Sequence, residues 1–371
     1  MKTVINALPY KQNSSGIGVM IRELFGRYAK LTDRPCQVIL SQDAPEFPEG
    51  KTTELVRIPL EHGQGLRRIF FQSVRMGREY CRDAVLLTTD SKTPFFLPKN
   101  CKLVPLVTDL AVYRMPEVYQ RSRVLLWRLQ YAYIRRRADL FLAISEFTKQ
   151  EMVKLLRIPP EKIRVIPMAC SESMTRVDDP TALAALREKY GLPERFILFV
   201  GNNNPRKNLE RTIRAFDLLK ERTGLPHRLV IAGEQGWKFD RERALEGVEH
   251  GDEVLFTGFV PDEDMPALYS AAELFIFSTL YEGFGVPVLE AQACGTPVVT
   301  SSVSALPEVA GEGAMLVDPR DPEDICRGMR AVLEDPALAA ELARKGRENV
   351  RRFDWAISAE RLKENVERDV T

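Results

Sequence analysis

The sequence predicts an α/β fold with two doubly wound domains, each a parallel sheet covered by helices on both faces. The first observation is length, because 371 residues are more than one hydrophobic core usually organises. The second is that short apolar runs, which suit strands, alternate with longer amphipathic stretches, which suit helices. The third is that the short runs are apolar throughout, as parallel strands buried on both faces are.

The predicted strands fall into two series, one in each half of the chain. The first series is 3–8, 37–41, 84–89, 103–109, 140–145 and 163–168. The second series is 196–201, 227–233, 254–259, 274–279, 296–301 and 314–319. Helices are predicted between them, for example over 19–30 and over 207–224, and the latter ends on Gly224. The polar, proline-terminated segment 168–180 separates the two series, which predicts a first domain over 1–172 and a second over 173–355.

Composition excludes several classes of protein. The chain has 53 Lys and Arg against 52 Asp and Glu, so its overall charge does not favour nucleic acid. The cysteines form no CxxC pair and the histidines lack ligand spacing, so we expect reduced thiols and no metal. We expect a cytoplasmic protein, because neither a signal-peptide pattern nor a long apolar run occurs. The cysteines are Cys36, Cys81, Cys101, Cys170, Cys294 and Cys326, and the histidines are His62, His227 and His250.

The stretch YEGFGVPVLEAQACGTPVVTS, residues 281–301, carries the strongest candidate site. The predicted strand 274–279 leads into a glycine-containing loop and then a helix with Pro287 in its first turn. Such a loop lies at the carboxyl end of a parallel strand, where open α/β sheets bind ligands, and the free amides of the helix start suit a phosphate. Glu282 and Glu290 then suit pairs of sugar hydroxyls, as in a sugar nucleotide. Taken alone, the two glutamates are equally well explained as solvated charges.

Two further turns follow predicted strands. In NNNPRKN, residues 202–208, Arg206 and Lys207 stand at a helix start, where adjacent cations are unfavourable unless an anion joins them. This favours a diphosphate site over a solvated basic turn. Near the amino terminus Gly16 and Gly18 form a GxG turn, which misses the full dinucleotide fingerprint and by itself indicates only a tight turn.

These motifs, in this order, resemble those of the retaining glycosyltransferases of family 4. The resemblance covers nearly the whole chain. It rests on GIG at 16–18, SEFTKQEM at 145–152, VIPMA at 165–169, VGNNNPRKN at 200–208, the segment 255–301 and LPEVAGEGAMLVDP at 306–319. It implies a GT-B architecture, with two Rossmann-like doubly wound domains facing each other across a cleft. It also implies that the last helix, about 356–371, returns to the first domain.

The resemblance assigns roles to individual residues. Glu282 would hold hydroxyls of the donor sugar, Glu290 would hold the ribose, and Arg206 and Lys207 would neutralise the diphosphate. Asp109 would lie in the cleft, although a helix-capping role suits it nearly as well. Other donor contacts would come from Gly16, from Phe284, Gly285 and Val286, and from Gly258, Phe259 and Val260.

The implied mechanism needs neither a protein nucleophile nor a metal. Fixed cations and amides would stabilise the charge that develops on the departing diphosphate, and the acceptor hydroxyl would attack from the same face. A DxD motif is present at Asp262–Asp264, but these acids precede a predicted helix, so we interpret them as helix caps and not as a metal site.

Two positions depart from the family pattern. Thr108 stands before Asp109 where many relatives have a histidine, which removes a usual contact to the donor sugar. Asn202 stands where some relatives have arginine, which leaves the diphosphate to Arg206 and Lys207.

Residues 60–140 form a basic region, with 15 Lys and Arg against 7 Asp and Glu. Its segments LRRIFFQSVRMGREYCR and RSRVLLWRLQYAYIRRR mix arginines with apolar residues, which suits an anionic membrane surface and a lipid-linked acceptor. The alternative is ordinary helices with an apolar stripe in the core and solvated arginines outside. Nucleic acid is not expected, because no binding motif accompanies the region.

The resemblance therefore implies a metal-independent retaining transferase that moves a hexose from a nucleotide-diphosphate sugar to a glycan or lipid-linked glycan in surface polysaccharide assembly. Mannose from GDP-mannose is the first expectation, and a UDP- or dTDP-linked glucosyl, N-acetylglucosaminyl or rhamnosyl donor is the alternative. Localisation would be cytoplasmic or peripheral at the inner membrane face. Two rivals are a GT-B sugar-nucleotide epimerase, which the scarcity of histidine disfavours, and a non-catalytic nucleotide-sugar-binding partner subunit, for which Thr108 is the hint.

Overall fold

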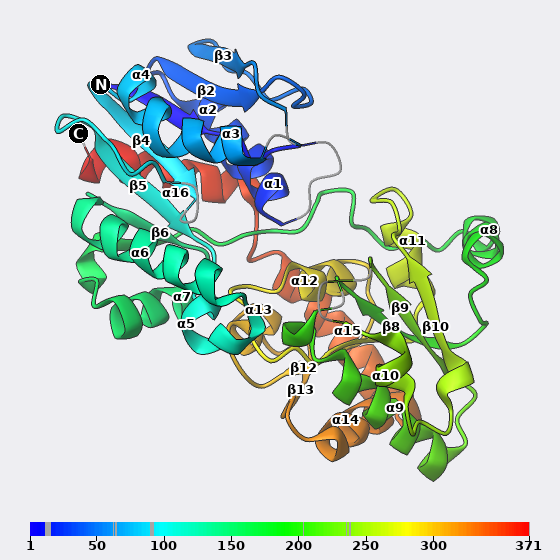
Figure 1. Cartoon of the computed structure of the whole chain (residues 1–371). Coiled ribbons are helices and arrows are strands. Elements are labelled where there is room, and N and C mark those ends of the chain that lie inside the picture. The colour runs from blue at the N-terminus through cyan, green and yellow to red at the C-terminus, as the bar shows by residue number, and fades with distance from the viewer. Residues whose placement is uncertain are drawn as a thin grey trace. The chain divides into compact units, whose positions relative to one another are not determined.

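The chain forms two compact units in a computed structural model that describes residues 1–370 apart from 12–15, 62, 64, 90–92, 203, 235 and 237–238 (Figure 1). Unit 1 comprises Met1–Met168 and Asp354–Thr371, and unit 2 comprises Ala169–Phe353. Each unit has its own all-parallel sheet, so the predicted doubly wound α/β fold class is confirmed. No helix among the described residues is long and apolar enough to cross a membrane. His62 lies outside them.

Unit 1 has a seven-stranded sheet in the order β3-β2-β1-β4-β5-β6-β7. Its strands are β1 (Lys2–Asn6), β2 (Cys36–Ser41), β3 (Thr53–Ile58), β4 (Ala84–Thr89), β5 (Lys102–Val107), β6 (Phe141–Ala143) and β7 (Ile163–Val165). Its α-helices are α1 (Ile17–Met20), α2 (Gly26–Leu31), α3 (Gly65–Phe70), α4 (Met76–Tyr80), α5 (Ala111–Arg114), α6 (Arg121–Arg137), α7 (Glu146–Glu151) and α16 (Trp355–Asp369). Its π-helical segments are η1 (Ile21–Phe25), η2 (Phe71–Arg75) and η5 (Met152–Leu156), and its short 3₁₀ helices are η4 (Pro116–Val118) and η6 (Pro160–Lys162).

Strand β3 is the element of this sheet that the sequence analysis missed. Its sequence, TELVRI, places Glu54 and Arg57 among the apolar residues, and most of its positions are only partly buried. The reason is its place at the sheet edge, where it pairs with β2 alone and one side is open. A search for continuous apolar runs finds central strands and overlooks such an edge strand.

The helices of unit 1 divide between the two faces of its sheet. The crossovers from β3 to β4 and from β5 to β6 run in the same direction across the sheet, whereas β1 to β2 runs the opposite way. Because parallel crossovers are right-handed, α3–η2–α4 and α6 cover one face, and α1–η1–α2 covers the other. Helix α16 packs against α2 on that second face (Figure 1).

The chain end is bound within unit 1 by polar contacts at three places along α16. Ser358 Oγ donates to the carbonyl of Pro167 at 2.8 Å, and Lys363 Nζ donates to the carbonyl of Leu31 at 2.8 Å. Near the helix end Asp369 pairs with Arg164 at 2.7 Å. The first boundary between the units falls at 168/169, four residues before the position expected from sequence, and Met174 already packs into the core of unit 2.

Unit 2 has a six-stranded sheet in the order β10-β9-β8-β11-β12-β13. Its strands are β8 (Phe196–Val200), β9 (Arg228–Ala232), β10 (Val254–Gly258), β11 (Leu274–Phe277), β12 (Val298–Ser301) and β13 (Met315–Val317). Its α-helices are α8 (Pro180–Tyr190), α9 (Leu209–Thr223), α10 (Arg241–Leu245), α11 (Met265–Ala271), α12 (Val286–Ala293), α13 (Leu306–Ala310), α14 (Pro322–Glu334) and α15 (Pro336–Val350), and its short turns are η7 (Pro205–Lys207) and η8 (Gly251–Glu253).

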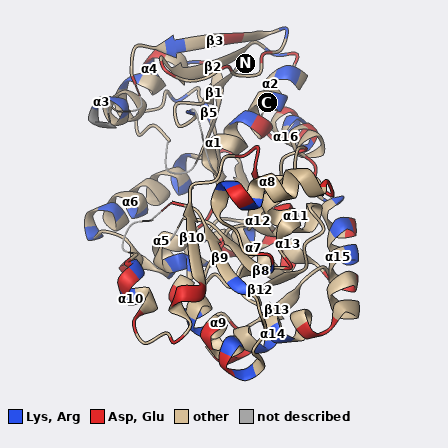
Figure 2. Ribbon diagram, turned by 90° about the vertical axis from the view of Figure 1, so that its right-hand side faces the viewer, with Lys and Arg blue, Asp and Glu red and all other residues tan. Residues whose placement is uncertain are grey.

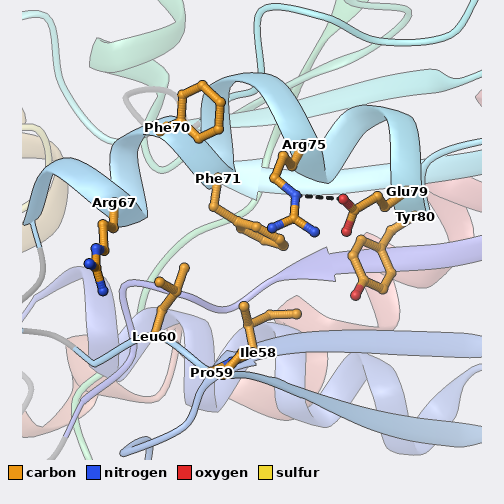
Figure 3. A pocket seen from close by; sticks show the side chains of 9 residues that line it. All are labelled: Ile58, Pro59, Leu60, Arg67, Phe70, Phe71, Arg75, Glu79 and Tyr80. Carbon is orange, nitrogen blue, oxygen red and sulfur yellow. Dashed lines mark hydrogen bonds and ion pairs between the residues drawn. The ribbon is translucent and has the colours of Figure 1, made fainter.

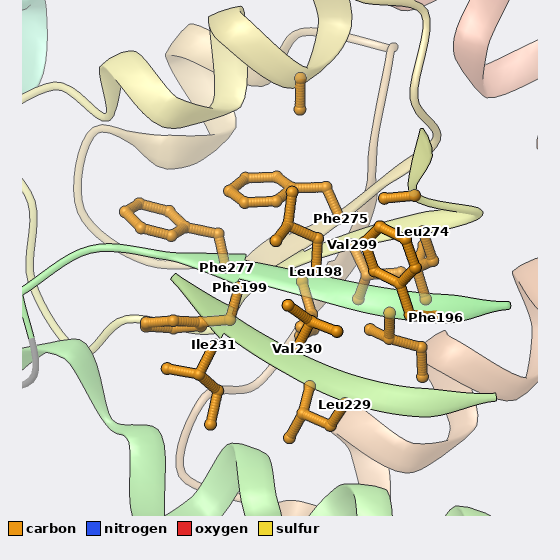
Figure 4. Packing of buried hydrophobic residues seen from close by; sticks show 14 of the residues in the cluster. Phe196, Leu198, Phe199, Leu229, Val230, Ile231, Leu274, Phe275, Phe277 and Val299 are labelled. Carbon is orange, nitrogen blue, oxygen red and sulfur yellow. The ribbon is translucent and has the colours of Figure 1, made fainter. Parts of the chain in front are cut away.

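The core of unit 2 is aromatic beside its two central strands. Phe199 of β8 and Phe277 of β11 have ring centroids 6.1 Å apart, and Phe275 stacks on Phe277 at 5.7 Å (Figure 4). All three side chains are fully buried. Burial of such large rings fixes β8 and β11 rigidly, and with them the loops that leave their carboxyl ends.

Candidate functional site

The candidate site of unit 2 lies where the chain order of the sheet reverses. Strands β8 and β11 are neighbours, with β9 and β10 continuing to one side and β12 and β13 to the other. The loops that follow β8 and β11 therefore leave the same edge side by side, at the usual ligand-binding point of a doubly wound sheet. A backbone hydrogen bond of 2.9 Å from the Leu280 N–H to the Arg206 carbonyl joins them.

The RKN turn presents its two cations from a tightly capped structure. Asn204 caps η7, and its side-chain oxygen accepts from the Arg206 N–H at 3.1 Å. The lysine stem passes over Gly201, where an added Cβ would lie 3.3 Å from Lys207 Cε and where φ is +150°. The ammonium group lies 4.5 Å from the centroid of the Phe277 ring. Gly201 and Phe277 together define the position of Lys207.

Glu282 and the two cations form a buried ionic cluster. The Oε1 atom of Glu282 lies 3.0 Å from Lys207 Nζ, and Oε2 lies 3.9 Å from an Arg206 nitrogen. Only 8% of the glutamate is exposed. Although Oε1 has the distance of an ion pair, no donor among the described residues meets it with the direction of a hydrogen bond. This buried oxygen therefore has an acceptor position that no described residue uses.

The cluster has more positive than negative charge. Burial raises the pKa of the Glu282 carboxyl, but the charges of Lys207 and Arg206 outweigh burial and hold that pKa below its usual value. Burial lowers the pKa of the Lys207 ammonium, and Glu282 opposes this only in part. An anion bound next to Lys207 would stabilise its charged form. The cluster thus has an excess positive charge that a bound diphosphate would neutralise.

Glu290 lies two turns further, on α12. Its Oε2 accepts from the Tyr269 hydroxyl at 2.7 Å, and the tyrosine ring packs edge-on against Phe275 with centroids 5.3 Å apart. Loss of water raises the pKa of the Glu290 carboxyl, and the Tyr269 hydrogen bond partly offsets this. Tyr269 is fully buried, so it fixes one carboxylate oxygen and leaves the other for a ligand.

The amino end of α12 supplies backbone donors beside the ionic cluster. Pro287 lies in the first turn, as predicted, and no side chain caps the helix. Gly285 has φ +114°, and an added Cβ would lie 2.5 Å from a Leu306 methyl, so only glycine fits there. Because Phe284, Gly285 and Val286 precede the first intrahelical hydrogen bond, their amides are available to an anion.

The predicted nucleobase segment lies at the end of β10. Gly258 has φ +74°, and its carbonyl accepts from the Gly233 N–H at 2.8 Å. Phe259 is 52% exposed, whereas the following Val260 is buried. The segment thus presents an aromatic ring anchored by a buried valine.

Two predicted site residues, Gly16 and Asp109, belong to unit 1. Gly16 precedes α1 with φ +54°, and an added Cβ would meet nothing within 4 Å. Asp109 follows β5 and is half-buried beside Thr108; its Oδ1 accepts from the Ala111 N–H at 2.9 Å. The aspartate thus has the capping contact that the sequence analysis kept open.

Asn208 is the residue of this site that sequence reasoning missed. It has φ +63° and is 4% exposed, and its amide donates to the carbonyls of Ser278 at 2.8 Å and Pro319 at 2.6 Å. It therefore links the RKN turn to the segments that follow β11 and β13. The signal was present, because asparagine is the non-glycine residue that best tolerates a left-handed conformation.

The cap predicted for the DxD motif is wrong at Asp264. This residue precedes α11, but its side chain makes no capping hydrogen bond. Its carboxylate instead binds Lys189 at 2.7 Å and the Tyr190 hydroxyl at 2.5 Å, because α8 brings two donors to it. Across the described ranges no group of three His, Cys, Asp or Glu side chains has the arrangement of a metal site.

Unit 1 contains a cavity of about 490 Å³ between the end of β3 and the α3–η2–α4 segment (Figure 3). Phe71 points into it, and Arg75 donates to Glu79, four residues further along the same helical segment, at 2.7 Å (Figure 3). Its lining is Ile58, Pro59, Leu60, Arg67, Phe70, Phe71, Arg75, Glu79 and Tyr80. The volume lies within the range of ligand pockets, and the lining is apolar with a few polar groups.

Comparisons with known proteins agree over most of the chain. Residues 14–171 match the model of Glycosyltransferase Family 4, and residues 184–349 match that of Glycosyl transferases group 1. The O-antigen chain mannosyltransferase B of Escherichia coli is 33% identical over 266 residues, which are 70% of this chain and 69% of that protein. The serotype-specific mannosyltransferase WbdA of Escherichia coli is 35% identical over 228 residues, 60% of this chain but only 28% of that protein.

A solved structure extends the likeness to the fold. Sucrose-phosphate synthase from Thermosynechococcus elongatus aligns with a TM-score of 0.75 over 99% of this chain and 98% of that chain, at 19% identity. Identity at this level shows the fold alone, which is that of the GT-B glycosyltransferases. With both halves matched by family models and a long relative above 30% identity, the chain belongs to glycosyltransferase family 4 and is a glycosyltransferase.

Proposed function

We propose that this glycosyltransferase is a retaining, metal-independent enzyme that moves a hexose from a nucleotide-diphosphate sugar to a glycan or lipid-linked glycan. The observation that carries the proposal is the buried cluster of Glu282, Lys207 and Arg206 beside the open amides of α12. Glu282 is compensated by its two neighbours, but the cluster keeps one more cation than carboxylate, which is costly to bury unless an anion joins it. A sugar diphosphate uses all three groups, since its hydroxyls meet the glutamate and its phosphates meet the cations.

The chemistry follows from where charge develops. As the bond between the anomeric carbon and the phosphate oxygen breaks, its electron pair goes to the diphosphate, and Arg206, Lys207 and the α12 amides stabilise the added negative charge. The acceptor hydroxyl attacks the anomeric carbon from the same face, and its proton passes to the departing phosphate oxygen. Because the charges lie in a buried cluster, they are fixed before the reaction begins.

Mannose from GDP-mannose is our first choice of donor. The support is the similarity to the Escherichia coli O-antigen chain mannosyltransferase B, whose name states its sugar. UDP- or dTDP-linked donors are the alternative. Phe259, exposed at the end of β10, suits stacking on any nucleobase, so the protein contacts described here favour no single base.

We propose that the acceptor binds to unit 1, in the pocket below α3 and η2. Its apolar lining with Arg67, Arg75 and Tyr80 suits a saccharide or a lipid-linked saccharide that carries phosphate. Contact of residues 60–140 with the inner face of a membrane belongs to the same proposal, because a lipid-linked acceptor would be presented there.

The proposal is tested by donor binding and product stereochemistry. Thermal shifts with GDP-, UDP-, dTDP- and ADP-sugars, with and without a chelator, should show one nucleotide raising the melting temperature in both conditions. Glu282→Gln should lose the additional shift that the sugar gives over the nucleotide alone. The anomeric configuration of the product, read by NMR, should match that of the donor. An inverted product, or a shift that requires a divalent metal, would contradict the proposal.

A further inference from the structure

The exposed apolar side chains of the protein are unevenly distributed. Among the described residues eleven large apolar side chains are exposed, and six of them lie in three segments of unit 1. The six have 49% to 62% of their surface exposed, and they are Ile69, Phe70, Phe96, Leu125, Leu126 and Leu129. Scattered single apolar residues are normal on a protein surface, but such a concentration marks an interaction site.

The three segments lie side by side on one face of the sheet. Right-handed crossovers place α3–η2–α4 and α6 on the same face. The described part of the loop after β4 contacts both, since the Phe95 N–H donates to the Ser73 carbonyl at 3.2 Å and Gln130 of α6 donates to the Thr93 carbonyl at 2.5 Å. The ring of Phe95 in this loop lies 5.6 Å from that of Tyr133 on α6, and Arg78 of α4 stacks 5.9 Å over Phe96. The six apolar residues therefore lie in three segments on the same side of the unit 1 sheet, and the middle segment contacts the other two.

The same surface is basic. Helix α6 contains six arginines and no acidic residue, and α3 adds Arg67 and Arg68 (Figure 2). Within the part of the chain that the structure describes, no carboxylate lies at ion-pair distance from five of the arginines of α6, which are Arg121, Arg123, Arg128, Arg135 and Arg136. We call these arginines, Arg67, Arg68 and the six apolar residues the basic–apolar face.

Helix α6 packs an ordinary apolar stripe on the core, with Val124 and Trp127 beside the buried Tyr131 and Ile134, and it exposes further apolar residues on its outer side. Its buried residues are Gln130, Tyr131 and Ile134, whereas Leu125, Leu126 and Leu129 point away from the sheet. The alternative that the sequence analysis kept open, an ordinary helix with its apolar stripe inside, holds for this core-facing stripe, and the exposed leucines are additional to it. Leucines and arginines mixed on an outer helix surface are typical of helices that lie in a membrane interface. The core of a protein–protein interface is instead depleted of charge.

We propose that the basic–apolar face docks unit 1 on the surface of an anionic phospholipid bilayer. The leucines and Phe70 would enter the boundary between headgroups and acyl chains, and the unpaired arginines would bind lipid phosphates. The role of this docking, though not the docking itself, rests on the proposed function, because a lipid-linked acceptor would be held at the same surface.

The test is sedimentation of the full chain with vesicles. The protein should bind vesicles of phosphatidylcholine mixed with phosphatidylglycerol, bind phosphatidylcholine alone far more weakly, and lose binding as salt rises. Leu125→Ser, Leu126→Ser and Leu129→Ser together should lower the vesicle affinity about tenfold or more. The matched control combines Leu31→Ser, Leu316→Ser and Ile357→Ser, which lie outside the face, and should leave binding unchanged.

Charge and folding are separated from the apolar effect by further measurements. Arg121→Gln, Arg135→Gln and Arg136→Gln together should weaken binding to the anionic vesicles and flatten its salt dependence. Each variant should keep its melting temperature and its thermal shift with the donor nucleotide. If the leucine variant binds as the parent does, or if the parent ignores anionic vesicles, the proposal is overturned. A leucine-dependent dimer in light scattering without vesicle binding would also overturn it, since a second copy would then cover the face.

The result of the vesicle-binding test can be separated from the proposed function. Vesicle binding without any nucleotide shift would leave the docking intact and remove the donor-site proposal. Transfer to a water-soluble acceptor in the leucine variant, with loss of vesicle binding, would support docking as a role separate from catalysis.

Discussion

Two groups of cations, one in each unit, occupy opposite environments. In unit 2 the Lys207 side chain is only 12% exposed, packs on Phe277 and pairs with Glu282 at 3.0 Å. In unit 1 Arg135 and Arg136 of α6 are exposed and have no carboxylate partner among the described residues. A buried, paired cation is fixed in place and serves one ligand geometry, whereas an exposed, unpaired cation serves any anionic surface and is screened by salt. In the two proposals, the same residue classes would thus serve recognition of a donor in one unit and binding to a membrane surface in the other.

The largest expected difference between the cations of the two units is their effect on the catalytic rate. Lys207→Ala should lower kcat about a thousandfold, because a fixed donor to the leaving group is removed from a buried site. The matched exposed change, Arg136→Ala, should alter kcat less than about twofold with a water-soluble acceptor. Steady-state kinetics on both variants check this. Equal losses would mean that the contrast between the units has no functional basis.

A second expected difference concerns stability. Asn208→Ala should lower the free energy of unfolding by about 2–4 kcal/mol, since two buried carbonyls lose their donor and alanine disfavours a left-handed backbone. Asn100→Ala removes an exposed amide that donates to Asp83, and should cost less than about 0.5 kcal/mol. Urea unfolding of the two variants measures the difference. A small effect at Asn208 would show that the two loops are held together without it.

These two predictions also mark what the sequence could and could not provide. The central strands and the RKN and EGFG loops were predictable, because continuous apolar runs identify buried parallel strands and functional loops follow their carboxyl ends. Strand β3 was not, since an edge strand carries charges that break the apolar pattern. The partners of Asn208 and Asp264 lie 70 or more residues away along the chain, and only the folded structure brings them together.

The exposed leucines of α6 show a different limit. The sequence indicated a basic helix with apolar residues, but an apolar residue on a helix is normally taken to face the core. Which side faces the sheet depends on packing against α5 and the turns around it, which no local pattern records. The sequence therefore indicated the segments of the membrane interpretation, and the structure showed which of their apolar residues are exposed.

The alkaline pH dependence of donor binding is a third test of the buried cation. Because burial lowers the pKa of Lys207, its charge is lost at a lower pH than that of free lysine, and donor affinity should fall as pH rises through this range. Glu282, Arg206 and Glu290 surround it, and none of these loses its charge as pH rises from neutral to alkaline. Lys207→Arg should move the decline to higher pH, because a guanidinium stays charged.

The control for this pH profile is a lysine on the surface of unit 1. Lys51→Arg changes an exposed residue in the same way and should leave the profile unchanged. The donor KM between neutral and alkaline pH, measured for the parent and both variants, gives the answer. An identical alkaline decline in Lys207→Arg would assign the titration to another group.

The smallest expected effect lies at Tyr269, which is buried and orients Glu290. Tyr269→Phe removes the donor to Glu290 Oε2, so donor affinity should fall about threefold to tenfold. The hydrogen bond also lowers the pKa of Glu290, which burial raises, so its loss should raise that pKa further. As the pH is lowered, the donor affinity of Tyr269→Phe should therefore begin to fall at a higher pH than that of the parent. The reason is that a protonated carboxyl cannot accept from both ribose hydroxyls. Tyr10→Phe, which removes a hydroxyl donating to a carbonyl in unit 1, is the matched control.

A nucleotide that lacks the ribose 2′-hydroxyl decides whether Tyr269 acts through the ribose. If Glu290 binds that hydroxyl in the orientation that Tyr269 sets, the deoxy donor and Tyr269→Phe remove the same interaction, and their combined effect is smaller than the product of the two. If the effects multiply in full, Tyr269 stabilises the helix without orienting Glu290, and the ribose contact must be sought elsewhere. In unit 1 no such coupling is expected between α6 arginines and the donor, because an exposed cation imposes no geometry on its partner.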